Sequence, residues 1–459
     1  MNTAPRVVIV GAGPAGIRAA ETLVAQGIRP LVIDEAARAG GQIYRRPPAG
    51  FTRPPEMLYG TEAGKARALH GLFDGMVAAG KVEHHPLSSV VAVVGQELVT
   101  IGPDGRRTIA FDRLILATGA TDRLAPVPGW QVPGVYSLGA TQIALKAQGV
   151  ALGRQIVLAG SGPLLTLVAV QLLKAGADLA AVLDTSSLGQ QLRGLPLMLS
   201  RPVFALRGAL MRARLRHIYH AGVTIERIEA DNLGPSAVRW KTAGGASRVS
   251  ACDMVGVGWH LRADTQLAGL AGCSFAYNEI WAQWLPRSDR MGRAAERVYL
   301  AGDGLRILGA DGAEVAGRLA ASACLADLGL PAPDPAADLR RLARLERFAR
   351  GVARAFPWPA EALRRLPDSA VVCRCEGVTA GALRETVDHG GAEANRVKSL
   401  GRVGMGRCQG RFCQLAGAEL IAAHAGMPVA AVGRLRDQAP VRPVPIGAWI
   451  KDTQPDSAR

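Results

Sequence analysis

Four cysteines near the C-terminus are the residues best suited to chemistry. They form two close pairs, Cys373 with Cys375 and Cys408 with Cys413. Thiolates are soft ligands, and four of them suit an iron–sulfur cluster or a tetrahedral zinc ion. Glycines beside the second pair let backbone N–H groups turn towards cluster sulfurs. The pattern therefore favours an iron–sulfur cluster, with structural zinc and unligated thiols as the alternatives.

A glycine-rich turn near the N-terminus is the second chemical signal. It follows the apolar run Val7–Val10, which predicts a buried parallel strand, and it opens a predicted helix. Glycines at such a turn keep it tight and allow close helix packing, and the helix N-terminus faces phosphates. The turn predicts a dinucleotide site at Gly11, Gly13, Pro14, Ala15 and Gly16.

An acidic pair ends the next predicted strand. Asp34 and Glu35 follow the apolar residues up to Ile33. An acid at this position of a dinucleotide fold hydrogen-bonds the ribose hydroxyls. By its spacing from Gly16 we expect Asp34 to take this role, with Glu35 as the second choice.

Two later turns favour FAD over a bare nicotinamide site. One ends an apolar strand at Ala117, Thr118 and Gly119, and the other ends a strand at Gly302 and Asp303. The carboxylate of Asp303 is expected to hold the ribityl hydroxyls. Each turn alone is explained by an ordinary strand end, but all three occur in one order along the chain.

In this order the turns resemble those of the two-dinucleotide-binding-domain flavoproteins, over about residues 6–325. Gly41 and Gln42 follow the acid as the double-glycine turn does in these proteins. The resemblance implies an α/β fold of two Rossmann-like domains, like that of the pyridine nucleotide-disulfide reductases, with FAD in the first. No cysteine precedes Cys252, so a redox dithiol relay is not expected.

A second glycine turn repeats the pattern imperfectly. Gly160 and Gly162 are present, but Leu165 replaces the third glycine and should push the helix away from its strand. No basic residue follows Asp184 to receive a 2′-phosphate. We therefore expect a retained scaffold, with a working NAD(P) site as the alternative.

Composition changes after residue 330 complete the predicted organisation. A proline-rich linker and an amphipathic, arginine-rich helix precede the cysteines. The predicted domains are an FAD domain from 1–125 and 290–330, a degenerate NAD(P)-like domain 126–289, a linker and helix 331–366, a small helical [2Fe–2S] domain 367–430, and a tail 431–459.

The net charge is +16 for 459 residues, carried mostly by arginine. The arginines are scattered without an aromatic-interleaved basic motif, so nucleic-acid binding is not expected. No signal peptide is visible, and we expect a cytoplasmic protein that reaches a membrane only through partners.

The cysteine region resembles the bacterioferritin-associated-ferredoxin-like [2Fe–2S] domain. The similarity covers Cys373 to about Gly426, including CRCE and GMGRCQGRFC. Its second cysteine pair is spaced more widely than in the founding domain, as in flavoprotein dehydrogenases that carry it.

The whole chain resembles the A-type subunit of heteromeric opine and amino-acid dehydrogenases. The resemblance implies that a separate FAD-containing beta subunit oxidises the C–N bond of an opine, amino acid or secondary amine. It also implies an FMN between the subunits, in some relatives a small ferredoxin-like third subunit, and electron exit through the cluster to a respiratory or other acceptor. Some relatives hold another adenine nucleotide in place of FAD.

No catalytic residue is evident in the sequence. Two alternative functions remain open, a stand-alone NAD(P)H-dependent flavin and iron–sulfur reductase, and a non-enzymatic cluster-carrying module. A competent second glycine turn would favour the reductase.

Overall fold

The first domain is built on a parallel sheet with one antiparallel edge. The computed structural model describes residues 5–48, 50–51 and 53–450. The strand order is β20-β21-β7-β1-β2-β3, and only β20 runs antiparallel to its neighbour. The strands are β1 (Val7–Val10), β2 (Leu31–Ile33), β3 (Glu83–His85), β7 (Arg113–Leu116), β20 (Arg293–Ala295) and β21 (Val298–Leu300).

Helices cover one face of this sheet and a small meander covers the other. The helices α1 (Pro14–Val24), α3 (Ala63–Ala78) and α9 (Gly309–Asp327) share a core with β1. The meander of β4 (Ser89–Val94), β5 (Glu97–Gly102) and β6 (Gly105–Ala110) closes the opposite face. Both faces are therefore buried, as an apolar parallel strand requires.

The second domain repeats this architecture on a five-stranded sheet of order β12-β11-β10-β16-β9. The strands are β9 (Val135–Ser137), β10 (Gln155–Ser161), β11 (Asp178–Asp184), β12 (Tyr219–Ala221) and β16 (Met254–Trp259). Its helices are α4 (Leu138–Ile143), α5 (Pro163–Lys174), α6 (Leu188–Met198) and α7 (Pro202–Ala213). A three-stranded sheet, β13 (Thr224–Asp231), β14 (Gly234–Lys241) and β15 (Ser247–Ala251), extends from it.

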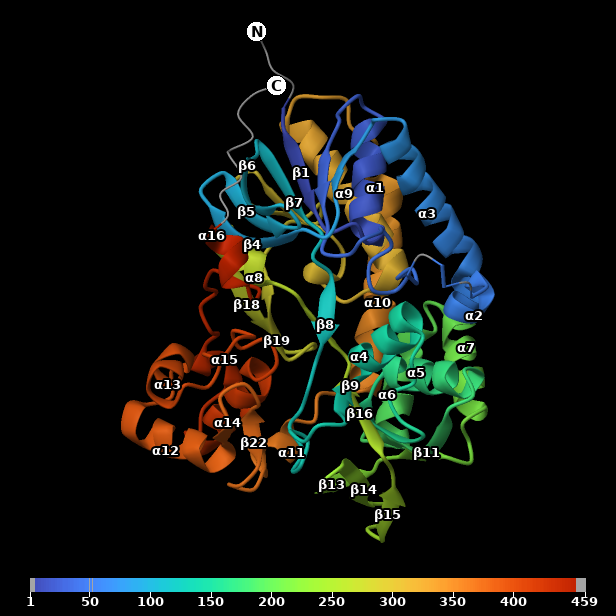
Figure 1. The fold of residues 1–459 in the computed structure, drawn as a ribbon, viewed down its shortest axis with the longest axis vertical. Helices are drawn as coiled ribbons and strands as arrows, with labels where there is room; N and C mark the ends of the chain where they lie inside the picture. Colours follow the sequence, from blue (N-terminus) through green and yellow to red (C-terminus); the bar gives the residue numbers. More distant parts are fainter. Residues whose placement is uncertain (1–4, 49, 52, 451–459) are drawn as a thin grey trace.

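Two short strands carry the chain between the domains. β8 (Ala120–Asp122) leaves the first domain and pairs antiparallel with the returning β17 (Leu261–Ala263), and Figure 1 shows β8 crossing the middle of the molecule. After β17 the chain packs on the first domain, where Leu267 of α8 (Gln266–Leu270) joins the core beneath β4. A hairpin of β18 (Phe275–Asn278) and β19 (Gln283–Pro286) follows.

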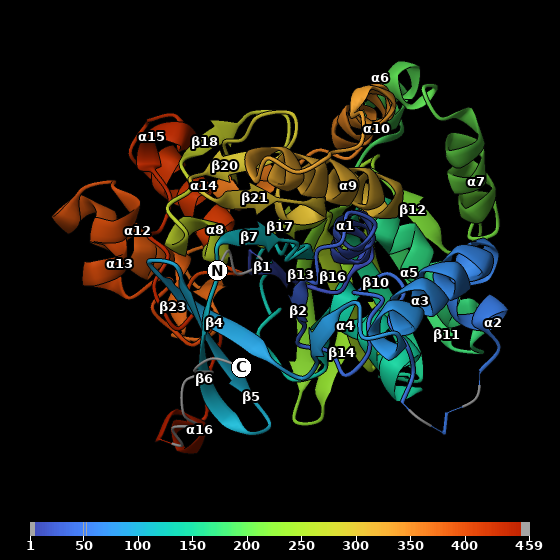
Figure 2. The same cartoon turned by 90° about the horizontal axis from the view of Figure 1, so that it is seen from above.

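The last part of the chain is mainly helical. The helix α10 (Ala336–Ala355) lies against α6 and α9 and leads to the C-terminal domain, drawn in orange and red in Figure 1. That domain contains α11 (Ala360–Arg364), β22 (Val371–Cys373), β23 (Val378–Thr379), α12 (Ala380–Gly390), α13 (Ala394–Gly401), α14 (Gln414–His424) and α15 (Val429–Val432). Figure 2 shows it on the opposite side of the molecule from α6 and α7.

The predicted α/β fold with a helical C-terminal region is confirmed. Within the described ranges no helix combines the length and apolarity that crossing a bilayer requires.

Candidate functional site

The first glycine turn is as tight as its sequence predicts. Gly11 has a φ of +106°, a conformation that favours glycine. A Cβ at Gly16 would overlap the carbonyl oxygen of Gly11, so α1 starts directly against the turn. The backbone amides at its N-terminus are therefore free to face an anion.

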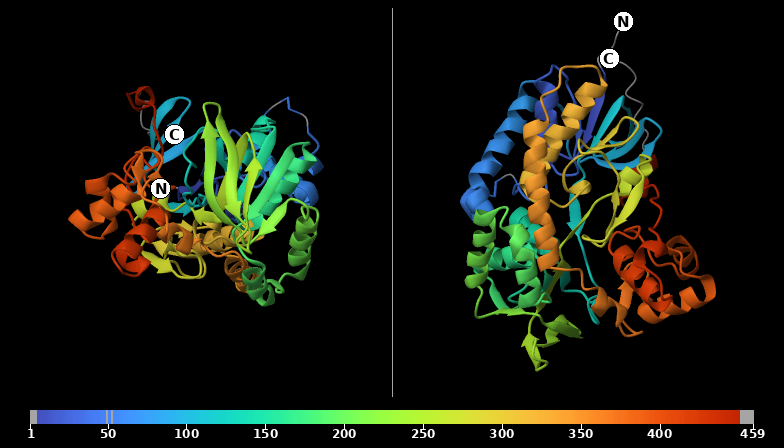
Figure 3. Two further views of the ribbon diagram at one scale, coloured as in Figure 1. Left: turned by 90° about the horizontal axis from the view of Figure 1, so that it is seen from below. Right: turned by 180° about the vertical axis from the view of Figure 1, so that it is seen from behind.

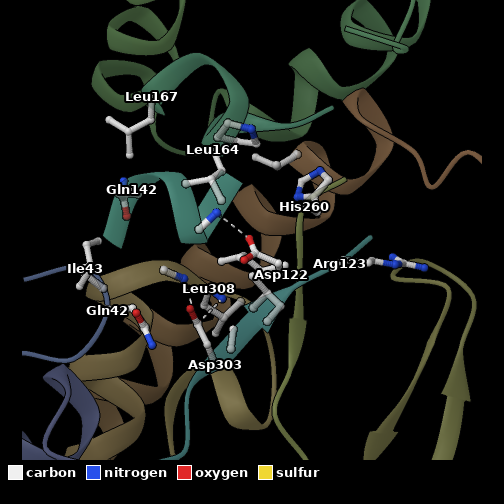
Figure 4. A pocket seen from close by; sticks show the side chains of 18 of the residues that line it. Gln42, Ile43, Asp122, Arg123, Gln142, Leu164, Leu167, His260, Asp303 and Leu308 are labelled. Atoms are coloured by element: carbon white, nitrogen blue, oxygen red, sulfur yellow. Dashed lines mark hydrogen bonds between the residues drawn. The ribbon is translucent and has the colours of Figure 1, made fainter. Parts of the chain in front are cut away.

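This turn opens on a cavity of about 1800 Å³. Of the expected nucleotide-binding residues, the cavity is lined by Gly11, Gly13, Pro14, Ala15, Asp34, Glu35, Gly41, Gln42, Ala117, Thr118, Gly119 and Asp303. Gly16 and Gly302 lie outside the lining, where they allow close packing against Gly11 and Ala15. Figure 4 shows Gln42 and Asp303 on this wall.

The two acids after β2 are held differently. The carboxylate of Asp34 accepts hydrogen bonds from the backbone N–H of Ala12 at 2.5 Å and of Ala36 at 2.7 Å, and its burial raises its pKa. Both its oxygens therefore bind the chain itself. Glu35 keeps a side chain that is 54% exposed, which pairs with Arg442 at 2.6 Å.

Asp303 is half-buried in the turn that follows β21. Its Oδ1 accepts hydrogen bonds from the N–H groups of Leu308, at 2.8 Å, and Gly309, at 3.1 Å. Burial raises its pKa to about 6. The carboxylate lies at the cavity wall as the turn predicts (Figure 4).

Sequence reasoning missed a buried cation on the opposite wall. Lys146 follows α4 in the second domain and is 4% exposed. Its Nζ lies 3.4 Å from the carbonyl of Ile43, and burial lowers its pKa to about 8. Among the described residues it forms no ion pair, so it supplies positive charge to the cavity. Lys146 belongs to the second domain, and only the tertiary structure brings it close to Ile43 of the first domain.

The second glycine turn is occupied by the protein itself. The ring of His260 lies against Gly162 at the start of α5, and its burial lowers the pKa of the imidazole to about 4. Asp184 accepts hydrogen bonds from the Ser186 N–H and the Tyr219 hydroxyl. Gly162 and Asp184 therefore lie outside the cavity lining, although Pro163 and Leu164 of α5 reach it.

Leu165 is fully buried in the core of the second domain. The helix α5 still begins directly after Gly162, at Pro163. The sequence shows no basic residue after Asp184, but the fold brings Arg212 of α7 to Tyr219, which hydrogen-bonds Asp184; the guanidinium carbon lies 4.4 Å from the ring centre.

The four predicted cysteine ligands come together in crossed pairs. The thiols of Cys373 and Cys413 lie within hydrogen-bonding distance, as do those of Cys375 and Cys408. Each pair therefore joins one residue of the first sequence pair to one of the second. Such pairing would offer two thiols to each of two metal ions, which is the ligand count that a [2Fe–2S] cluster needs.

Backbone amides surround the sulfur of Cys373. The N–H groups of Gly404, Glu376 and Cys375 donate to it. A side chain at Gly406 would overlap Cys375, so the loop passes close beside that thiol. No three Cys, His, Asp or Glu side chains in the described part of the chain are grouped as a single metal ion requires.

The loop between Cys408 and Cys413 reaches the nucleotide cavity. Its residues Arg411 and Phe412 line the cavity wall. The guanidinium of Arg411 donates to Gln266 Oε1 at 2.7 Å, and Gln266 Nε2 donates to the carbonyl of Gln409 at 3.3 Å. The cysteine loop is thus attached to the start of α8.

The same segment binds the turn at Thr118. The Thr118 hydroxyl donates to the carbonyl of Asp264 at 2.6 Å, and the Asp264 N–H donates to Gly119. The Asp264 carboxylate also pairs with Arg442 at 2.8 Å. Residues 264–266 therefore connect the expected flavin turn, the tail and the cysteine loop.

Comparison with known proteins agrees with this arrangement. The pyridine nucleotide-disulphide oxidoreductase model matches residues 5–320, and the sarcosine oxidase A3 domain matches residues 368–453. The A-type subunit of opine oxidase from Rhizobium meliloti is 37% identical, over 95% of this chain and 86% of that protein. The chain belongs to this family. It is an oxidoreductase subunit of the heteromeric flavin dehydrogenase type, as its sequence predicts.

Further relatives extend the family. Hydrogen cyanide synthase subunit HcnB of Pseudomonas aeruginosa is 31% identical over 98% of both chains. The crystal structure of L-proline dehydrogenase from P. horikoshii has the same fold, with a TM-score of 0.71, 19% identity, and coverage of 97% of this chain and 79% of that one.

Proposed function

We propose that the chain is the electron-transferring subunit of a dehydrogenase whose partner oxidises a C–N bond. The substrate class is an opine, an amino acid or a secondary amine, in line with the relatives named opine oxidase and sarcosine oxidase. The observation that carries the proposal is the shared wall: Arg411 and Phe412 of the cysteine loop line the cavity that holds the glycine turn.

The cavity residues fit FAD. The α1 N-terminus and the turn at Gly13 would face the pyrophosphate, and Asp303 would accept hydrogen bonds from the ribityl chain. Asp34 stays the acid assigned to the ribose, because it lines the cavity and each of its oxygens keeps a lone pair beyond its backbone hydrogen bond; Glu35, which pairs with Arg442, is the second choice. Another adenine nucleotide would use the same phosphate and ribose contacts.

The cysteine loop fits a [2Fe–2S] cluster better than zinc. Zinc is held by four ligands around one point, whereas these thiols form two pairs that receive backbone N–H hydrogen bonds. When bound, a flavin accepts a hydride and a cluster carries single electrons, so the two together convert between two-electron and one-electron transfer. The chain's own role is to fix both sites through residues 264–266.

The substrate pocket is proposed to lie on a partner. An FAD-containing beta subunit would oxidise the amine, an FMN would lie between the subunits, and a respiratory or other acceptor would receive the electrons. A small ferredoxin-like third subunit remains a prediction. The names of the relatives as subunits support a heteromeric assembly.

An anaerobic titration of the purified chain with NADH and NADPH, followed by absorbance, tests this function. We expect flavin and cluster bands that neither nucleotide bleaches, because His260 covers Gly162. Adding the beta subunit together with its amine substrate should then bleach both bands. Rapid bleaching by either nucleotide alone would instead support the stand-alone reductase.

A further inference from the structure

Two helices at the edge of the molecule expose an unusual row of apolar side chains. On α7, Val203, Leu206 and Leu210 are 78%, 61% and 58% exposed and recur on one helix face. Leu199, just before α7, is 58% exposed. None of these four lines the cavity, so they face away from the nucleotide site. We call these four residues the α7 ridge.

The ridge lies in a strongly cationic segment. Residues 185–225 contain six arginines and no Asp or Glu. In the described part of the chain, the exposed Arg193 and Arg214 form no ion pair. The adjacent helix α10 lies beside α6 (Figure 3) and exposes Arg340, Arg341, Arg347, Arg350 and Arg354, which are likewise without ion pairs in the described residues.

These features exclude two occupants on physical grounds. A second copy of the same surface would bring arginines against arginines, because the two acids of α10, Asp338 and Glu346, already pair with Arg318 and Arg306, and like charges repel. A nucleic acid would neutralise the arginines but would leave four large aliphatic side chains against a polar phosphate backbone. The occupant must offer negative charge and an apolar environment within the same few ångströms.

We propose that α6, α7 and the adjoining face of α10 bind the surface of an anionic lipid bilayer. The ridge side chains would enter the boundary between headgroups and acyl chains, while the arginines would contact lipid phosphates. Arginine suits this position because its long aliphatic stem stays with the apolar side chains as its guanidinium reaches the headgroups. The helices lie on the bilayer and do not cross it, in agreement with the absence of a spanning helix among the described residues.

This surface leaves the cysteine domain free. Figure 2 shows the C-terminal domain on the side of the molecule opposite α7. A bilayer at α7 therefore does not obstruct access to Cys375, the exposed member of the four cysteines. The inference rests on surface chemistry alone and does not depend on the proposed function.

Vesicle flotation with the full chain tests the proposal. We expect the protein to float with vesicles of phosphatidylcholine and phosphatidylglycerol in equal amounts, and not with phosphatidylcholine alone. Raising the salt concentration should weaken the binding, because part of it is electrostatic. The triple variant Val203→Glu, Leu206→Glu, Leu210→Glu should lower the bound fraction about tenfold, because each carboxylate would be placed at the apolar level of an anionic bilayer.

Two further variants make the result specific. Leu233→Glu is the matched control, because Leu233 is 97% exposed on the β13–β14 turn, and it should float like the unchanged chain. The double variant Arg193→Gln, Arg214→Gln should bind anionic vesicles more weakly without a change in thermal midpoint. Absent flotation, or flotation that the triple variant does not reduce, would overturn the proposal. If the unchanged chain does not float while the triple variant loses a partner subunit on co-purification, the ridge is a protein interface instead.

Discussion

The two glycine turns share their first two glycines but differ in what lies against them. In the first, Gly13 has a φ of −79° and the N-terminus of α1 faces the open cavity. In the second, Gly162 has a φ of +105° and the ring of His260 covers it. The backbone amides of the first turn therefore face the cavity, whereas the ring of His260, the residue after β16, packs against the second turn. A repeated fold can keep its strand–turn–helix geometry after its binding site has closed.

The acids that follow the two turns also differ in their accessibility. The Asp34 carboxylate accepts a hydrogen bond from Ala12 of the turn. The neighbouring Glu35 pairs with Arg442 and keeps an exposed side chain. Asp184 is 1% exposed and has no accessible acidic neighbour, because Thr185, Ser186 and Ser187 follow it. The first domain thus has acids at the cavity wall, whereas Asp184 of the second domain lies outside the lining.

Exchanging residues at the third turn position should give the largest effect. Gly16→Val would drive its side chain into the carbonyl of Gly11, so we expect loss of bound flavin and a destabilisation of about 3 kcal/mol or more. Leu165→Ala should cost about 2–5 kcal/mol by leaving a cavity, with flavin retained. Flavin content and denaturant unfolding measure both. Equal flavin loss in the two variants would contradict the comparison.

Removing one cysteine ligand should separate the cluster from the flavin. Cys408→Ser is expected to abolish bound iron and leave flavin content unchanged, since the glycine turn lies on another domain. Cys252→Ser is the matched control, because Cys252 is a buried thiol of the second domain far along the chain from the pairs. Iron and labile sulfide analysis decides the result. Unchanged iron in Cys408→Ser would contradict the ligand assignment.

Removing the His260 side chain from the second turn should have a smaller effect, on the binding of NADPH. His260→Ala would expose Gly162 at the start of α5, and Arg212 would be available for a 2′-phosphate. We expect weak NADPH binding, about tenfold tighter than for the unchanged chain, measured by calorimetry. His217→Ala, a change at an exposed histidine, should leave binding unchanged. If His260→Ala does not bind NADPH better, closure by His260 is not what disables the turn.

The pH dependence of flavin binding should show the smallest effect. Burial raises the pKa of Asp303 to about 6, above its ordinary 3.8. Its contribution to folding stability is therefore fully present below pH 3.8 and is lost as pH rises through about 6. Above about pH 6 the ionised carboxylate accepts hydrogen bonds on both oxygens, and below it the protonated group does not. Flavin affinity should therefore fall a few-fold between about pH 7 and pH 5. Asp303→Asn should remove this dependence, and fluorescence titration at several pH values would measure it.

Much of the first nucleotide site could be predicted because its signals are local. A tight turn such as Gly11 to Gly16 needs glycine wherever a Cβ would meet backbone, and this requirement is written into consecutive residues. The strand before it and the acid after it follow from the same short segment. The order of the three turns and the domain architecture were likewise predicted from the sequence.

The contacts of Asp34 and Glu35 were not predictable from the local sequence. The N–H groups of Ala12 and Ala36 donate to Asp34, and Arg442 of the tail pairs with Glu35. The pairing of Cys373 with Cys413 and of Cys375 with Cys408 was not predictable from the local sequence either. The two cysteine loops approach each other only because α14 packs against α11 and α12.

The sequence by itself determined the two Rossmann-like domains and the residues of the first turn, because these follow from backbone sterics and apolar periodicity, and the order of its motifs carried the resemblance to the family. The tertiary structure alone decided that His260 closes the second turn, that Lys146 enters the first cavity, and that Arg411 meets Gln266. These contacts join residues far apart in the chain, and their energies depend on burial and on which hydrogen-bonding groups are already satisfied. No local pattern records such information.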